Sequence, residues 1–202
     1  MDVRIRVAAV GAAASGARGE VPVAVLVALG LAAPGPSARA AQAPDLSGLH
    51  AFDLRVGKWK IHNRVLKARL AGSHDWLEYD GAQTWRSLLN GWGNVDDTFL
   101  DKPGGAYSGA TLRAYDPKTG QWAIWWLDGR TPTAKLDPPM LGRFANGVGT
   151  FYNDDSLRGK PIRVRFIWSK ITRNSAHWEQ AYSPDGGKTW ETNWISDFTR
   201  TG

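Results

Sequence analysis

Three stretches of the chain place a polar side chain two residues after a tryptophan. The pairs are Trp76 with Glu78, Trp178 with Gln180, and Trp194 with Ser196. Side chains two apart point to the same face of a β-strand, so the members of each pair would share a face. A carboxylate or an amide among aromatic rings is costly unless it meets a hydrogen-bonding partner, and such groups often mark a pocket. The spacing predicts a site that combines ring stacking with polar recognition, and Glu78 is its candidate general acid or base.

The sequence alone leaves the strand register open, so Glu78 and Gln180 can face either the interior or the solvent. Arg113 can pair with Glu78 in the interior or lie on the surface. The eleven tryptophans likewise admit two interpretations, packing in a core or lining a cavity in the mouth of a barrel. In the second interpretation, the cavity is lined by Trp76, Glu78, Arg113, Trp126, Trp178, Gln180 and Trp194.

Other catalytic chemistries lack a matching pattern. The four histidines show no metal-ligand spacing, and adjacent residues such as Asp96 and Asp97 point to opposite faces of a strand, so no metal site is expected. The chain has no Cys, no Gly-x-Ser-x-Gly and no Gly-rich phosphate loop before a helix. His177, the C-terminal histidine, lies on the face opposite Trp178 and so away from the expected aromatic site. We therefore expect no cofactor and assign no catalytic residue.

The elements that must position these residues are β-strands. Turn signals recur every 8–15 residues, and no convincing amphipathic helix appears. Asn146-Gly147 is a strong two-residue hairpin signal, and the stretch 117–120 is another turn. The stretch "LDPPMLG" is a break that suits a rim loop. We expect about ten strands in sequential hairpins, which is typical of an antiparallel up-and-down barrel or a sandwich.

The stretch "SPDGGKTW", residues 183–190, matches the Asp-box of sialidases and related β-propellers. A propeller repeats its blades at a period of about 40–50 residues, and this motif occurs once. The stretch is better interpreted as a hairpin connection. In it Asp185 accepts hydrogen bonds from turn N–H groups, Gly187 supplies a positive φ, and Trp190 packs over the turn.

Residues 1–43 differ from the rest and predict a secretory signal. Three arginines precede the apolar run 23–33, and Ala-x-Ala cleavage sites follow. The run is too short for a membrane span, although an uncleaved anchor is an alternative, and the basic region is atypically long. Without these residues, which hold four arginines and two acids, the chain keeps 21 basic and 17 acidic residues, interspersed. This pattern favours a solvated surface over a nucleic-acid patch.

Residues 44–202 are then the single folded domain. The start Gly57-x-Trp59 of the first strand resembles that of lipocalin-like (calycin) barrels. The segments "LNGWGNVDD", "TLRAYDPKTGQWAIWWLDGR", "LDPPMLGRF", "GVGTFYNDD", "IRVRFIWSKIT" and "WEQAYSPDGGKTWETNW" together resemble an uncharacterised bacterial family, a domain of unknown function with a predicted lipocalin-like barrel. The resemblance implies the fold and brings no reaction. It also implies that Arg200 packs over Trp59 to close the barrel.

These observations together predict an all-β, antiparallel up-and-down, lipocalin-like barrel of about ten strands after a signal segment. The expected function is that of an exported protein, periplasmic or secreted, which binds a small apolar or aromatic molecule in an aromatic-lined cavity. One alternative is an enzyme in the same cavity with Glu78 as acid or base. Another is a structural or partner-binding envelope protein with a filled core. No nucleic acid and no membrane span after cleavage are expected, and the oligomeric state is left open.

Overall fold

The computed structural model describes residues 43–202 and is built almost entirely of β-strands. Ten strands follow one another along the chain. They are β1 (Gly57–Leu66), β2 (Trp76–Leu88), β3 (Gly93–Leu100), β4 (Tyr107–Asp116), β5 (Gln121–Asp128), β6 (Met140–Ala145), β7 (Val148–Leu157), β8 (Lys160–Ser169), β9 (Ser175–Ser183) and β10 (Glu191–Arg200). Two short 3₁₀-helices, η1 (Asp53–Arg55) and η2 (Leu89–Gly91), complete the elements.

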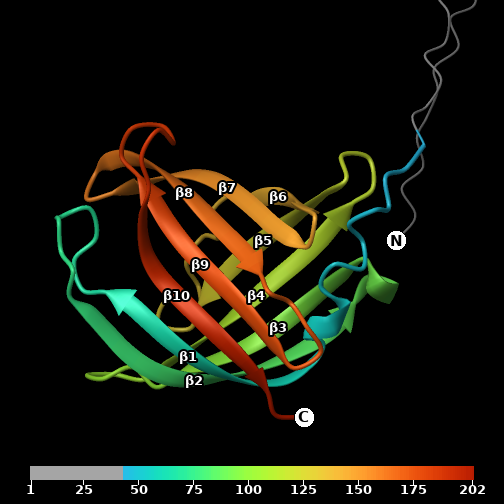
Figure 1. The fold of residues 1–202 in the computed structure, drawn as a ribbon, viewed down its shortest axis with the longest axis horizontal. Helices are drawn as coiled ribbons and strands as arrows, with labels where there is room; N and C mark the ends of the chain where they lie inside the picture. Colours follow the sequence, from blue (N-terminus) through green and yellow to red (C-terminus); the bar gives the residue numbers. More distant parts are fainter. Residues whose placement is uncertain (1–42) are drawn as a thin grey trace, which may run out of the picture. The chain divides into compact units, whose positions relative to one another are not determined.

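The sheet closes on itself as an up-and-down barrel (Figure 1). Each strand pairs antiparallel with the next, and β1 pairs with β10 from Trp59 opposite Arg200 to Val65 opposite Trp194. The prediction of an all-β antiparallel barrel of about ten strands is therefore confirmed, and the sandwich alternative is wrong.

Alternation of apolar and polar residues builds the wall. In β8, Ile162, Val164 and Trp168 are buried while Arg163 between them is exposed. In β1, Trp59, Ile61 and Asn63 are buried and their neighbours are exposed. Because side chains alternate between the two faces of a strand, every second one points into the barrel. Sequences that alternate in this way therefore form strands around one core.

The tight turns follow the expected chemistry. Asn146 and Gly147 have φ of 51° and 78°, the pair of positive values that a type I′ hairpin requires. Arg158 and Gly159 make the same kind of turn, with φ of 52° and 76°, which the sequence did not signal as strongly. The stretch 183–190 connects β9 to β10, so it is a hairpin connection and not a propeller blade.

The segment 43–56 covers one end of the barrel. Phe52 enters the core, where its ring meets those of Trp122 at 5.2 Å and Phe144 at 4.9 Å. The indole of Trp59 donates to the Arg55 carbonyl over 2.7 Å, and the indole of Trp122 donates to the Gly48 carbonyl over 2.9 Å. This end of the barrel is filled and forms its floor.

Arg200 lies over Trp59 at the floor, with its guanidinium carbon 4.3 Å from the ring centroid. The guanidinium also donates to the carbonyls of Leu54 and Val56, which ties the last strand to the segment before the first. Gly57 makes room for this contact: its φ is 130°, and a Cβ there would lie 2.2 Å from Nη1 of Arg200. The geometry matches the closure that the resemblance implied.

One seam in the wall is short. β5 and β6 pair over three positions only, from Trp122 opposite Gly142 to Ile124 opposite Met140. Every other neighbouring pair of strands matches over five to ten positions. The stretch "LDPPMLG" lies here, where the loop 129–139 runs before β6 begins. The prolines at 138 and 139 suit this place, because proline cannot donate to a central ladder.

The expected signal segment, residues 1–43, lies outside the described residues except for its last one. Within 43–202, none of the helices has the length and apolar character to cross a membrane.

Candidate ligand-binding cavity

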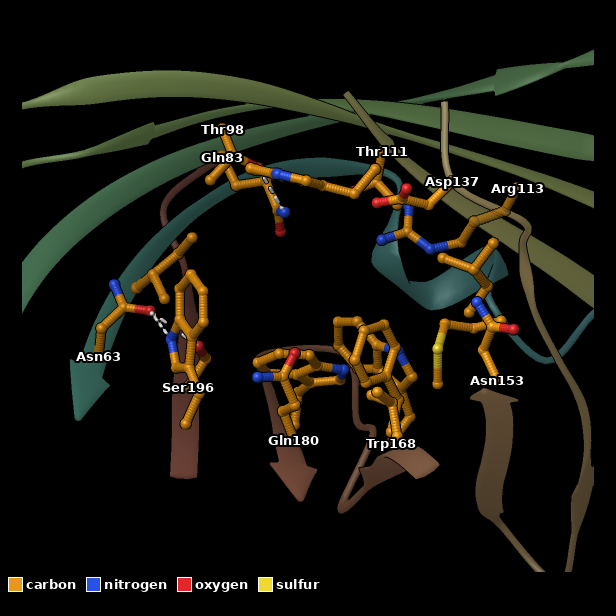
Figure 2. Close-up of a pocket in the computed structure, with 18 of the residues that line it drawn as sticks. Asn63, Gln83, Thr98, Thr111, Arg113, Asp137, Asn153, Trp168, Gln180 and Ser196 are labelled. Carbon is orange, nitrogen blue, oxygen red and sulfur yellow. Dashed lines mark hydrogen bonds between the residues drawn. The ribbon is translucent and has the colours of Figure 1, made fainter. Parts of the chain in front are cut away.

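The interior above the floor is hollow. A cavity of about 230 Å³ lies between the strands and extends to the exposed residues Asp137 and Pro138 of the loop before β6. Its two long sides differ in chemistry. Figure 2 shows Gln83, Thr98, Thr111 and Arg113 along one side, and Trp168 and Gln180 along the other.

The aromatic side comes from β8, β9 and β10. The Trp178 ring meets those of Phe166 at 4.9 Å, Trp194 at 5.7 Å and Trp168 at 6.4 Å. The first two contacts are edge-to-face, the geometry that aromatic quadrupoles favour. Phe198 and Tyr182 extend the same wall. These rings give the space an apolar wall, which suits packing of another ring.

The polar side comes from β2, β3 and β4 and is held by a chain of hydrogen bonds. Gln83 Nε2 donates to Thr98 Oγ1 over 2.8 Å, and that hydroxyl donates to Asp96 Oδ1 over 2.7 Å. Arg113 Nη1 donates to Asp96 Oδ2 over 2.6 Å. The side chains lie on one inner face because they occupy alternate positions of paired strands.

Arg113 is buried, with 3% of its surface exposed. Its guanidinium carbon lies 3.8 Å from the centroid of the Trp85 ring, a close cation–π contact. Burial lowers the pKa of Arg113, and the charge and hydrogen bond of Asp96 oppose that shift. The group is a fixed positive charge on the cavity wall.

Asn63 ties β1 to the aromatic wall. Its Oδ1 accepts from Trp194 Nε1 over 3.0 Å and from Ser196 Oγ over 2.8 Å. Gln180 is anchored in a similar way, because its Nε2 donates to Asn193 Oδ1 over 2.8 Å. The polar groups in the aromatic wall are therefore oriented by neighbours and not free to rotate.

Five of the seven residues expected at the site line this cavity: Arg113, Trp126, Trp178, Gln180 and Trp194. Trp126 lies nearest the surface and is 38% exposed. Trp178 and Trp194 belong to the aromatic wall, and Arg113 faces them from the polar wall. The structure thus brings residues from β4, β5, β9 and β10 around one space.

Glu78 and Trp76 do not line it, and their expected placement was wrong. Glu78 pairs in register with Arg64, next to the inward pair Asn63 and Tyr79, so it points outward. Its side chain is 57% exposed and lies 3.4 Å from His62. Trp76 is on the same outer face, 6.0 Å from the Arg64 guanidinium. Arg113 pairs with Asp96 and not with Glu78.

This placement removes the basis for acid–base catalysis by Glu78 inside the cavity. His177 is also on the outer face, where Nδ1 lies 2.6 Å from Asp197 and Nε2 lies 2.8 Å from Glu179. Its ring does not reach the interior, in line with its expected position opposite Trp178. Within residues 43–202, Asp96 carries the one buried carboxylate, and it forms a salt bridge with Arg113.

Sequence reasoning missed part of the polar wall. Asn63, Gln83 and Thr98 were not among the expected site residues, and Asp96 was considered only as a metal ligand. Arg55 was also missed. It is fully buried at the floor, where its guanidinium carbon lies 3.8 Å from the Trp59 centroid. A single arginine before the first strand carries no signal of burial.

Comparisons with known proteins show likeness only in structure. No protein-family model and no curated protein matches the chain. Among solved structures, it is similar to the S-type phycobiliprotein lyase CPES from Guillardia theta, with 9% identity over 75% of this chain and 90% of that chain and a TM-score of 0.52. It also matches EF1p2_mFAP2b bound to DFHBI, with 10% identity over 76% and 98% and a TM-score of 0.40. The closed sheet and the first of these likenesses show the fold alone, an all-β, lipocalin-like barrel.

Proposed function

We propose that the protein binds a small apolar or aromatic molecule inside the barrel. The observation that carries the proposal is the cavity itself, with aromatic rings on one side and oriented polar groups on the other. A concave apolar site with a few convergent polar groups is the usual form of a small-molecule site. A barrel that served only as a rigid scaffold would gain stability from filling this space.

The size of the cavity narrows the ligand. Its volume of about 230 Å³ lies below the roughly 300–1,000 Å³ of sites for drug-sized ligands. A molecule of one ring or two fused rings fits such a space better than a macrocycle such as haem. Stacking on Trp178 and burial of apolar surface, at about 25 cal/mol per Å², would supply the affinity. Arg113 and Gln180 would orient the ligand.

A fluorescence titration tests the proposal. Fatty acids, aromatic acids and haem are added to the protein, and a ligand should change tryptophan emission saturably. Trp178→Ala should weaken binding by roughly 1–3 kcal/mol, because stacking and buried area are lost. Trp76→Ala is the matched control, since Trp76 lies on the outer face, and it should leave the affinity unchanged. If no compound binds better than millimolar, the binding role fails and a structural role for the barrel takes its place.

Export is a further part of the proposal. It is supported by the basic residues, the apolar run 23–33 and the Ala-x-Ala sites before residue 44. The chain recovered outside the cytoplasm of a bacterial host should begin at Ala41 or Pro44. An intact Met1 on soluble cytoplasmic protein would exclude cleavage.

Membership of the uncharacterised bacterial family is proposed on the same terms. Its support is that six separate segments carry the resemblance and that the barrel it implies is the one observed. The activity of the phycobiliprotein lyase is not carried over, because 9% identity concerns the fold only.

A further inference from the structure

The buried charges of the barrel do not balance. Within residues 43–202, three charged side chains are buried: Arg55 at 0% exposure, Arg113 at 3% and Asp96 at 0%. Two guanidinium groups thus share one carboxylate. A buried charge without a counter-charge is strongly unfavourable. The interior therefore has one excess positive charge, which an anion would neutralise.

The hydrogen-bonding groups show the same imbalance. In the described part of the chain, the buried side-chain atoms without a partner are Arg55 Nε and Nη1, Asn63 Nδ2, Arg113 Nε and Arg165 Nε. All are N–H donors. The orientation of the Asn63 amide is settled by Trp194, whose indole can only donate and therefore faces Oδ1. The buried part of the described chain therefore has more hydrogen-bond donors than acceptors to pair with them.

Two of these donors, Arg113 Nε and Asn63 Nδ2, belong to residues that line the cavity. Arg113 and Asn63 are both at least nine-tenths buried, at 3% and 1% exposure. Figure 2 shows them at opposite ends of the space. A neutral water in the space could not supply the missing charge.

The aromatic rings around the arginines do not replace a counter-ion. Arg55 lies between Trp59 at 3.8 Å and Phe198 at 4.2 Å, and Arg113 lies over Trp85 at 3.8 Å. Ring faces attract a cation through their quadrupole. They accept no hydrogen bond at the edge of the guanidinium plane, where Nε points. Arg55 and Arg113 also pack on the same Trp85 ring, so each adds to the other's unfavourable field.

We infer that the ligand of this cavity is a carboxylate, an aromatic or short aliphatic acid whose anionic group binds at the Arg113 end with Arg55 behind it. The inference rests on the proposed function and adds the chemical class of the ligand. The carboxylate oxygens accept from Arg113 and neutralise the excess charge. The ring or chain of the ligand lies against Trp178 and the other rings of the aromatic wall.

A matched pair of probes tests the charge separately from the shape. The full chain is titrated by calorimetry with 2-naphthoate and with 2-naphthamide at pH 7. The two molecules share size and ring system and differ in charge. The carboxylate should bind at least tenfold tighter than the amide. Equal affinity, or tighter binding of the amide, overturns the inference and leaves the proposed function standing. If neither probe nor any acid of the wider panel binds, both fail.

Variants locate the anion. Asp96→Asn combined with Arg113→Gln removes the wall charge without leaving a carboxylate unpaired, and it should abolish the preference for naphthoate. Arg55→Gln removes the excess charge from behind the wall, and it should reduce the preference while naphthamide binding stays within twofold. Arg86→Gln is the control, because Arg86 is exposed on the outer face of β2, and it should keep the full preference.

The variants can also contradict the assignment. Retention of the preference in both interior variants would place the anion elsewhere and overturn the inference. So would its loss in Arg86→Gln, which would indicate binding to the basic surface. If the double variant does not fold, Arg55→Gln and the wild-type probe pair decide the question.

Discussion

The guanidinium of Arg113 and the carboxylate of Asp96 meet 2.6 Å apart on adjacent strands, with both side chains buried. The contact is charge-assisted and short, as expected where water is excluded. It leaves Arg55 as the second cation beside a carboxylate that is already engaged. The energetic roles of the three groups are therefore unequal.

Asp96→Asn should lower the free energy of unfolding by about 3–5 kcal/mol, because two buried cations then lack any counter-charge. Arg113→Gln should cost less, since Arg55 still offsets the Asp96 charge. The double variant should be less destabilised than Asp96→Asn alone. Urea denaturation of the three variants measures these differences. An equal decrease in the free energy of unfolding in the two single variants would contradict the unequal energetic roles of Asp96 and Arg113.

The floor closure depends on Gly57. Gly57→Ala should destabilise the protein by about 2–4 kcal/mol, because a φ of 130° is strained for alanine and the new Cβ would displace Arg200 from Trp59. Gly72→Ala is the control: Gly72 also has a positive φ, of 66°, but nothing lies within 4 Å of a Cβ there. It should cost only about 1 kcal/mol, the usual penalty for alanine at a positive φ. Thermal unfolding compares the two, and similar losses would show that the contact with Arg200 is unimportant.

The β9–β10 connection should be sensitive to acid. The backbone N–H of Thr189, then its hydroxyl and that of Ser183, hold the pKa of Asp185 far below its usual 3.8. A carboxyl whose pKa is depressed by folding adds stability above its unfolded pKa, and that stability is lost as the pH falls below about 4. Asp185→Asn should therefore flatten the dependence of the melting temperature on pH between about 4 and 2.

Asp154→Asn is the matched control for this titration, because the Asp154 side chain is 87% exposed on β7 and lies 4.0 Å from Arg163. It should leave the pH profile unchanged. The Asp185 variant should also keep its ligand affinity, since the turn does not line the cavity. Loss of binding without loss of stability would instead place the turn in a site.

Glu78→Gln should change neither ligand affinity nor the selectivity between charged and neutral ligands by more than twofold. The side chain points away from the cavity toward His62. The same titrations that compare Trp178→Ala with Trp76→Ala provide the measurement. A marked shift in selectivity would mean that the barrel carries its ligand on the outer face of β1 and β2.

Glu78 and Gln180 show where sequence reasoning succeeds and where it ends. Both follow a tryptophan by two residues, yet Gln180 faces the cavity and Glu78 faces solvent. Alternation predicts which residues share a face but not which face is inner. For β2 the answer is set by pairing with β1, where Trp59 lies opposite Gln83.

The barrel itself was predictable, because turn signals and alternation act locally and agree along the chain. The polar wall was not. Gln83, Asp96 and Thr98 form an interior network only because β2 and β3 bring them side by side. Each is a polar residue of a type that usually faces solvent, so the sequence alone gives no sign of its burial. Arg55 is harder still, since its burial depends on rings contributed by β1 and β10.

The pairing of β5 with β6 over three positions makes this seam the joint at which the barrel wall opens most easily. Widening the wall anywhere else breaks five or more matched positions, so mechanical strain concentrates where the fewest hydrogen bonds resist it. The joint borders the cavity at Met140 and lies close to the prolines before β6. The volume of the unliganded cavity is therefore the smallest that this seam permits. We expect a ligand larger than the cavity to enter only by parting β5 from β6, at a cost in free energy that rises with their separation.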